Sequence, residues 1–493
     1  LGLPFSSTRL NPIVNRKRPS KALGLCITDT FKIAPRRTLD YGLRWDYFSA
    51  ATFADGLMFA WDRNTANVIV PESARSKVSP FYPRTINVGT GEVVPDPDQG
   101  NFVPRIAAAY RLTDNTVIRG GYGMFSEFLG KFVRVEGGGP FQVTETYFNT
   151  IENRVPLFQM PNPFPGAGVS PTLPSQSVSG YPRQTENGRI HQFNVTVERQ
   201  VKDVGFRLSY VGSRNRGMNY GLAINKPAPS LIPFSASRRP YTQFVGASFP
   251  RSDGRSNYDS LNLQANRRVG WVTFDAHWTW AHGMSDFLNT ENPYSPKMWN
   301  RDFLAKHKVV FNTLWELPLG RGRRFLPTVP GAVDHLVGGW RITWVTYLQG
   351  GQYFSPSFSG ADPSNTNTFG GLPDRICDGN LPPGERRVDR WFNPSCFVAP
   401  PAGRFGNSGA NVLEGPGLHS HNVTVAKRFR LTEKLHFNYL CLISNVFNRA
   451  NFLFPATNIS DPGQAGVIGE THGLYSGERG GQRMIEMRVR LEF

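Results

Sequence analysis

The chain contains thirteen segments of 10–13 residues in which apolar and polar side chains alternate. Such alternation is typical of β-strands, because successive side chains of a strand point to opposite sides. Globular strands usually have five or six residues, whereas a tilted strand that crosses a membrane needs about 9–11. The predicted strands are 22–33, 39–48, 102–112, 116–127, 189–201, 205–215, 257–268, 271–283, 306–318, 339–350, 420–430, 435–447 and 483–493.

The last of these segments has the clearest pattern. From Ile485 to Phe493 every second residue is apolar, and the residues between them are charged. A wall with lipid outside and water inside requires this pattern. A half-buried strand of a soluble protein has the same alternation, so the connections must decide between the two.

The connections between the predicted strands alternate between short and long. Outer-membrane barrels have tight turns on the periplasmic side and long loops outside, and with Phe493 in the periplasm every long connection lies outside. A medium connection, 319–338, contains Val333–Val337 and predicts a short periplasmic helix. The short connections are 34–38, 113–115, 202–204, 269–270 and 431–434, and the long ones are 49–101, 128–188, 216–256, 284–305, 351–419 and 448–482.

Composition agrees with a membrane barrel. The chain is 39% hydrophobic and 13% aromatic, with 50 Gly and 39 Pro, and no run approaches the roughly 18 apolar residues of a membrane-spanning helix. Its net charge is +18, but the Arg residues are dispersed and no nucleic-acid-binding motif is present, so no nucleic acid partner is expected. The sequence therefore predicts an all-β fold, an antiparallel transmembrane β-barrel with long extracellular loops in the cell outer membrane.

Aromatic and charged residues receive separate interpretations. Rings near strand ends predict belts at the two membrane interfaces, namely Trp45, Tyr47, Tyr110, Tyr122, Trp271, Trp280, Trp315 and Trp340. Charges in the strands predict a lumen lined by ion pairs that also seats a plug, with direct ligand contact as the alternative. These charges are Arg44, Arg105, Arg119, Arg199, Arg207, Arg488 and Arg490 beside Asp46, Glu198, Glu486 and Glu492.

Several motifs, in order along residues 22–493, resemble the Oar-like group of TonB-dependent receptors. They are Thr28–Pro35 leading into Thr38–Phe48, Asn101–Ile106, Thr116–Gly123, Arg390–Asn393, Arg404–Gly409, Gly415–Gly417 and Asn445–Phe452. The resemblance implies a 22-stranded barrel in a Gram-negative outer membrane. Residues 22–493 would then be the C-terminal part of this barrel, and residues 1–21 a partial N-terminal segment. Thirteen is odd whereas bacterial barrels have even strand numbers, so we expect about nine further strands and a plug domain before Leu1. Phe141–Thr150 is a candidate for an additional strand.

The resemblance also implies partners. These are the TonB complex through the plug, the barrel assembly machinery through Phe493, and outer-membrane lipid and lipopolysaccharide. The substrate, a small molecule, an oligosaccharide or a peptide, would bind the extracellular loops before energy-coupled uptake.

One loop contains the candidate site residues. Arg387, Arg390, Trp391 and Phe392 form an aromatic–arginine patch, which suits either ligand contact or packing against neighbouring loops. Cys377 and Cys396 flank this patch. A disulfide between them would stabilise the loop by about 3 kcal/mol, and two free thiols are the alternative.

The sequence contains no enzyme signature. Gly406–Gly409 lacks the Gly-x-Ser-x-Gly spacing of a nucleophile elbow, and the histidines lack metal-ligand spacing, so we expect no catalytic residue, metal or cofactor. Two other hypotheses stay open. The first is a passive porin-like or adhesin-type barrel without energy coupling, and the second is a secreted all-β carbohydrate-active enzyme.

Overall fold

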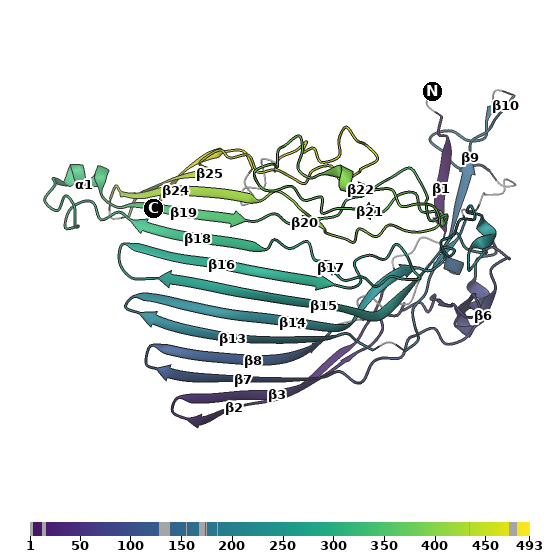
Figure 1. Cartoon of the computed structure of the whole chain (residues 1–493), viewed down its shortest axis with the longest axis horizontal. Helices are drawn as coiled ribbons and strands as arrows, with labels where there is room; N and C mark the ends of the chain where they lie inside the picture. Colours follow the sequence, from purple (N-terminus) through teal and green to yellow (C-terminus); the bar gives the residue numbers. More distant parts are fainter. Residues whose placement is uncertain are drawn as a thin grey trace.

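The computed structural model describes residues 3–11, 16–127, 139–153, 155–166, 173, 175–184, 186–432, 434–472 and 481–493. One antiparallel sheet dominates it, and thirteen strands follow one another across this sheet in sequence order (Figure 1). They are β2 (Ala22–Ala34), β3 (Arg37–Phe48), β7 (Phe102–Thr113), β8 (Thr116–Ser126), β13 (Arg189–Val201), β14 (Val204–Ala223), β15 (Gly246–Arg267), β16 (Val272–Ser285), β18 (His307–Glu316), β19 (Trp340–Gln349), β24 (Leu418–Arg430), β25 (His436–Ser444) and β26 (Met484–Glu492).

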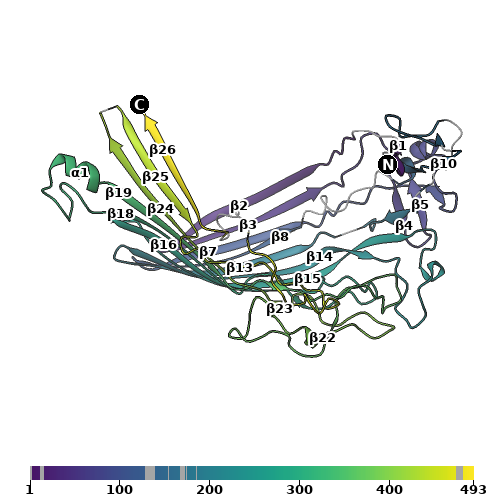
Figure 2. The same cartoon turned by 90° about the horizontal axis from the view of Figure 1, so that it is seen from above.

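Each of the thirteen predicted strands corresponds to one strand of this sheet, which confirms the prediction. Figure 2 shows that the sheet is curved, with β2 and β26 at its two edges. Among the described residues, no strand pairs with β2 other than β3, and none pairs with β26 other than β25. The sheet is therefore an open wall.

The hairpin of β14 and β15 is longer than predicted. Its register continues to the pair Ala223↔Ser248, past irregularities at Arg216, Met218 and Tyr220. The predicted connection 216–256 therefore shrinks to 224–245, because backbone pairing goes on where the alternation of side chains stops. A bulge shifts the side-chain alternation without ending the ladder.

Shorter elements occupy the connections. The candidate strand in Phe141–Thr150 exists as β9 (Val143–Phe148), but it pairs with β1 (Ser6–Asn11) and not with the sheet. The other short strands are β4 (Ala60–Asp62), β5 (Asn67–Val70), β6 (Val88–Thr90), β10 (Ile151–Glu152), β11 (Val155–Pro156), β12 (Ser177–Ser179), β17 (Asn300–Arg301), β20 (Tyr353–Phe354), β21 (Asp374–Arg375), β22 (Phe397–Val398) and β23 (Leu413–Glu414). The 3-10 helices are η1 (Glu72–Lys77), η3 (Gly139–Phe141), η4 (Ala236–Arg238) and η5 (Pro394–Cys396).

The predicted short helix is α1 (Gly331–Val337), at the end of the sheet where the short turns lie (Figure 1). It follows Pro330, which occupies the N-cap position. In the described part of the chain, no helix combines the length and the apolar character needed to cross a bilayer.

One face of the sheet exposes apolar side chains along its strands. On the edge strands, Ile27 is 75% exposed and Met487 is 67% exposed. Rings gather at the short-turn end of this face, where Trp271 packs edge-on against Trp315 with centroids 6.0 Å apart. An apolar face of this extent matches a lipid-facing wall with an aromatic belt.

The opposite face is polar. Glu198 forms an ion pair with Arg207 at 2.7 Å and another with Arg119 at 3.2 Å. The prediction that Arg199 shares this face is wrong. Arg199 is paired across the ladder with Phe206, so it lies on the apolar face beside Val197. Adjacent residues of a strand point to opposite sides, so Glu198 and Arg199 cannot both face the lumen.

The long connections form two packed bodies at the opposite end of the sheet from α1. The body that we call the first loop cluster has a core made of Phe59, Trp61, Val68, Val70, Ala74, Tyr82, Ile86, Phe141, Val143, Val178, Phe244 and Ala247. The body that we call the second loop cluster has a core made of Phe354, Phe392, Cys396, Phe397 and Leu413.

Candidate ligand-binding site in the long connections

Aromatic side chains hold the first loop cluster together. Trp61, in β4, is 2% exposed, and its ring meets Tyr241 edge-on with centroids 4.7 Å apart. Phe244 and Phe249 approach the same indole at 6.0 and 6.3 Å. Edge-to-face contacts of this kind add to the stabilisation from burial. They join the connection after β3 to the one between β14 and β15.

A cavity of about 1020 Å³ lies in this cluster. Its walls come from β4, from residues 92–95, from residues 181–184 and 186, and from Phe249–Asp253 of β15. Ligand pockets in proteins typically have volumes of about 300–1,000 Å³. The cavity is therefore large enough for a small molecule or a short oligomer.

Two residues that line the cavity have buried polar atoms without a hydrogen-bond partner among the described residues. They are Nε1 of Trp61 and Oγ of Ser252. A buried polar group without a partner costs about 1–3 kcal/mol, so native proteins rarely leave one unsatisfied. Both atoms are sealed from solvent in this conformation, so a ligand in the cavity could reach them only if the surrounding side chains moved.

Charged groups of both signs surround the same cavity. Arg251 forms an ion pair with Asp253, which also accepts a hydrogen bond of 2.9 Å from the hydroxyl of Tyr220. On the other wall, Arg183 donates to Glu92, and this hydrogen bond raises the pKa of the guanidinium above its usual value. The guanidinium therefore stays charged, and the cavity offers donors and acceptors to a polar ligand.

A second cavity, of about 510 Å³, lies in the second loop cluster. Arg386 lines it and bonds Glu414 at 3.0 Å, with its guanidinium 5.8 Å from the ring centroid of Trp391. Arg301 stands 4.2 Å from the ring centroid of Tyr353 in the same wall. As in the first cavity, these arginines have partners, Glu414 for Arg386 and the ring of Tyr353 for Arg301.

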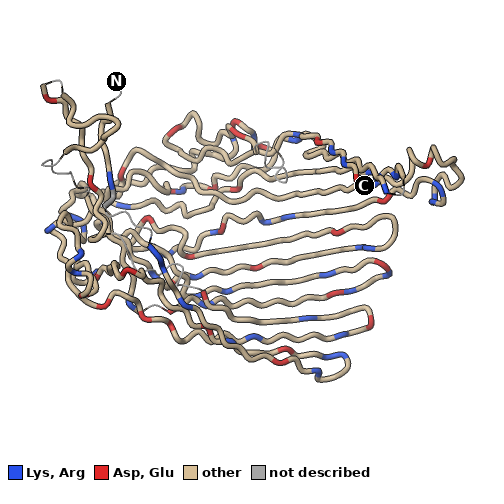
Figure 3. The backbone as a smooth tube through the Cα atoms, turned by 180° about the vertical axis from the view of Figure 1, so that it is seen from behind, with Lys and Arg blue, Asp and Glu red and all other residues tan. Residues whose placement is uncertain are grey.

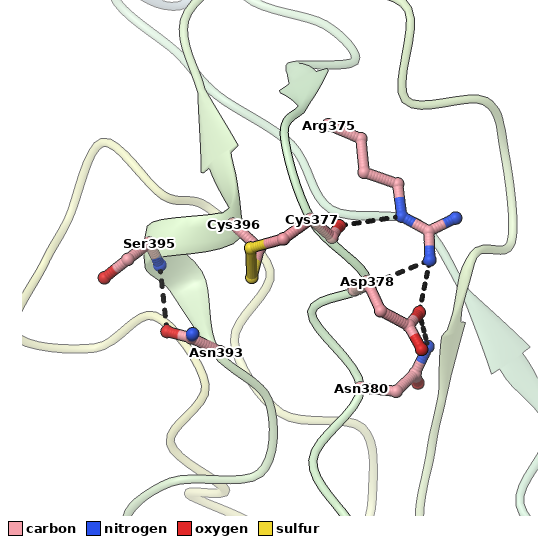
Figure 4. Close-up of a disulfide and its surroundings, with 7 residues drawn as sticks. All are labelled: Arg375, Cys377, Asp378, Asn380, Asn393, Ser395 and Cys396. Carbon is pink, nitrogen blue, oxygen red and sulfur yellow. Dashed lines mark hydrogen bonds and ion pairs between the residues drawn. A yellow bond between two sulfur atoms is a disulfide. The ribbon is translucent and has the colours of Figure 1, made fainter.

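The disulfide between Cys377 and Cys396 fastens the second loop cluster (Figure 4). The sequence left this pairing open. Arg375 packs beside it, donating to the carbonyl of Cys377 at 3.1 Å and to Asp378. The link joins η5 to the segment that follows β21, so the predicted patch lies on a closed loop.

The structure separates the residues of the predicted patch. Arg387 and Arg390 form a tight turn with reciprocal backbone hydrogen bonds of 3.0 and 3.1 Å, and neither lines a cavity described above. Trp391 is half-buried and donates from Nε1 to the carbonyl of Glu414 at 2.9 Å. Phe392 is 1% exposed in the cluster core, so a ligand cannot reach it in this conformation. Phe493 is fully exposed at the end of β26.

Sequence reasoning missed the residues of the larger cavity. Arg251, Ser252 and Asp253 fall in a segment predicted as a loop, and Trp61 lies in a strand of only three residues. Neither segment has a recognisable motif. The one available signal was the tryptophan itself, since loops seldom contain a large apolar ring without packing it.

Among the described residues, no group of His, Cys, Asp and Glu side chains has the geometry of a metal site.

A protein-family model described as an outer membrane beta barrel domain matches residues 1–485. A search of curated proteins finds no match.

Several solved structures are similar in part. They include FpvA of P. aeruginosa bound to heterologous pyoverdines, with 9% identity, a TM-score of 0.44, and coverage of 97% of this chain and 39% of that one. The ferric-catecholate import receptor Fiu of E. coli K12 has 10% identity, a TM-score of 0.43, and coverage of 96% and 44%. A mutant of the ferric enterobactin receptor PfeA from Pseudomonas aeruginosa has 9% identity, a TM-score of 0.44, and coverage of 96% and 45%. The chain thus spans less than half the length of each.

Proposed function

The chain belongs to the outer membrane beta barrel domain family, and from this premise we propose that it forms the ligand-binding part of an outer-membrane receptor. The apolar face of its sheet then lies against lipid, and the long connections face the cell exterior. The ligand we propose is a polar small molecule, oligosaccharide or peptide that enters the cavity of about 1020 Å³ in the first loop cluster.

The observation that carries this proposal is the polar and charged lining of that cavity. Arg183 and Glu92, which form an ion pair, line one wall. Arg251 and Asp253 stand beside Ser252 and supply charged partners of either sign. A site of this kind rejects apolar molecules, because they would leave its polar groups unpaired.

The open sheet supports a larger protein around this part. In a bilayer, unpaired backbone groups of an edge strand cost several kcal/mol each, so membrane sheets close into barrels. Further strands would pair with β2 and β26, and residues 22–493 would be the C-terminal portion of the completed barrel. A plug domain inside it, implied by the resemblance to TonB-dependent receptors, would couple ligand release to TonB.

A passive porin-like barrel or an adhesin is the alternative function. Both would use the same loops, but neither requires TonB. Uptake by living cells can therefore separate the three.

The test uses spent medium that contains carbon-13-labelled polar metabolites. Cells that produce the intact protein are incubated in this medium, and the depletion of each labelled compound is measured. Parallel cultures lack the protein, lack TonB, or carry Ser252→Ala together with Arg251→Ala. The control variant, Arg75→Ala with Arg84→Ala, removes exposed charges of the same loops that do not line the cavity.

We expect at least one labelled compound to be depleted only by cells that have both the protein and TonB. The cavity variant should lose most of this depletion, and the control variant should keep it. Depletion that needs the protein but not TonB would indicate a passive pore. If no compound depends on the protein, the transport proposal is refuted and an adhesin is favoured.

A further inference from the structure

The connection between β18 and β19 is the exception among the connections at the short-turn end. It runs from Leu317 to Gly339, contains α1, and extends beyond the end of the sheet (Figure 1). The turns on either side of it are much shorter, with four residues between β15 and β16 and five between β24 and β25. Joining two strands does not require such a long insertion. The side chains of the connection therefore indicate what it does.

Internal hydrogen bonds give the connection a defined shape. The backbone N–H of Gly320 bonds the carbonyl of Phe325 at 3.1 Å, and that of Phe325 bonds Pro318 at 3.0 Å. The carboxylate of Asp334 accepts from the backbone N–H of Arg321 at 2.6 Å, which ties the loop to α1. The loop is therefore a folded unit against the helix.

The carboxyl end of α1 is fixed to the lipid-facing side of the wall. The carbonyl of Leu336 accepts from Nε1 of Trp340 at 2.9 Å and from Nζ of Lys427 at 2.8 Å. Helix ends leave such carbonyls unpaired, and a cation there also interacts favourably with the helix dipole.

The register of the sheet shows on which face this anchor lies. Trp340 pairs with Lys427, Lys427 with Tyr439, and Tyr439 with Val489, so the four residues form one row across four strands. Val489 belongs to the exposed apolar face of β26. The row therefore lies on the lipid-facing side, and Lys427 is shielded there by the rings of Trp340 and Phe429 at 5.1 and 4.6 Å.

The outer surface of the connection is apolar and basic. Phe325, Leu326, Val333 and Leu336 are exposed, Leu336 to 69%. Three exposed arginines, Arg321, Arg323 and Arg324, accompany them, and no described carboxylate forms an ion pair with any of the three. Figure 3 shows blue marks of this connection beyond the end of the strands. Apolar side chains beside unpaired cations, next to an aromatic belt, match the surface of an interfacial membrane anchor.

We propose that residues 319–338 dock onto the periplasmic leaflet of the outer membrane and bind the phosphates of anionic phospholipid headgroups. Phe325, Leu326 and Leu336 enter the boundary between headgroups and acyl chains. The arginines donate hydrogen bonds to headgroup phosphates, for which the guanidinium fork is well suited. The proposal depends on the outer-membrane location of the chain and not on which ligand its outer cavity takes.

The test measures hydrogen exchange of the amides of 319–338 in the intact protein. The protein is reconstituted in nanodiscs of phosphatidylcholine alone, or of phosphatidylcholine mixed with phosphatidylglycerol. One variant carries Arg321→Gln, Arg323→Gln and Arg324→Gln. The control carries Arg75→Gln, Lys77→Gln and Arg84→Gln, which remove the same charge from exposed positions at the other end of the sheet.

We expect phosphatidylglycerol to slow exchange of this segment by up to about a hundredfold in the wild type, since each of the three arginines near an anionic surface strengthens binding roughly fivefold. The three-arginine variant should lose this slowing and the control should keep it. Raising the salt from about 0.1 M to about 1 M should abolish it as well, because the charges become screened.

Equal exchange in the two lipid mixtures would overturn the proposal and would favour a protein in the periplasm as the occupant of this surface. Unchanged heat-modifiable gel mobility of each variant shows that the barrel has folded. A Leu336→Ser variant adds a second measurement, because it keeps every arginine. It should reduce the slowing only in part, and a full slowing would contradict the insertion of this side chain.

Discussion

The two loop clusters reach a defined structure by different means. The first packs twelve buried residues, five of them aromatic, and its described part has no disulfide. The second has a core of five residues and one disulfide, with half-buried ion pairs such as Arg386–Glu414 around it. Small bodies that cannot bury enough apolar surface usually need a covalent link. The contrast predicts that the same kind of substitution has different consequences in the two clusters.

Loss of an aromatic ring from the first cluster should have the largest effect. Phe244 is 1% exposed and packs against Trp61, so Phe244→Ala should cost about 3–5 kcal/mol of local stability. Hydrogen exchange should become faster throughout residues 57–95 and stay unchanged in residues 372–398. Faster exchange in both regions would mean that the clusters unfold as one unit.

Removal of the disulfide should affect only the second cluster. Cys377→Ser with Cys396→Ser opens a loop with a sequence separation of 19, and the expected cost is about 3 kcal/mol. Limited proteolysis in detergent should then cleave residues 377–396, and a reducing agent should do the same to the wild type. Resistance in both experiments would show that the apolar core of the second cluster suffices by itself.

The ion pairs of the second cluster should matter less. Arg386 bonds Glu414 and lies over Trp391, so Arg386→Ala should cost about 1 kcal/mol. Arg387→Ala provides the matched control, because Arg387 is well exposed and its pair with Asp389 lies at the surface. In denaturant-dependent proteolysis, the stability of the Arg386→Ala variant should be lower than that of the control. The control should be as stable as the wild type.

The smallest effect concerns Glu291, which accepts the backbone N–H of Leu372 at 3.1 Å. Burial raises the pKa of this carboxyl above its usual value of 4.5. Its contribution to stability is therefore complete below pH 4.5 and is lost as the pH rises through the raised pKa. Glu291→Gln should resemble wild type in acid and become the more stable of the two toward neutral pH.

A pH series of proteolysis protection around Leu372 would measure this difference. Glu385→Gln, at an exposed position nearby, serves as the control. A Glu291→Gln variant that is less stable than wild type at neutral pH would show that the charge itself is needed.

The wall was predictable and the site was not, for a physical reason. In β26 a one-residue shift of register would move Ile485 and Met487 from lipid to water, so the pattern of side chains specifies the strand. Trp61 and Ser252 line one cavity because distant connections pack together, and no period in the sequence encodes that packing. Arg199 was placed on the wrong face because its charge was used for the prediction. The face of a strand residue follows from the alternation along the strand and not from its charge.

The length of the β14–β15 hairpin has a mechanical consequence. The 22 residues of β15, at about 3.3 Å each, give a strand of about 70 Å, whereas the hydrocarbon core of a bilayer is about 30 Å thick. Even a tilted strand of this length rises well above the lipid. Ser252 and Asp253 lie at the register irregularity of this strand, and its backbone runs from them to Arg267 at the short-turn end. A ligand bound there would therefore be held by a strand that is itself anchored in the membrane.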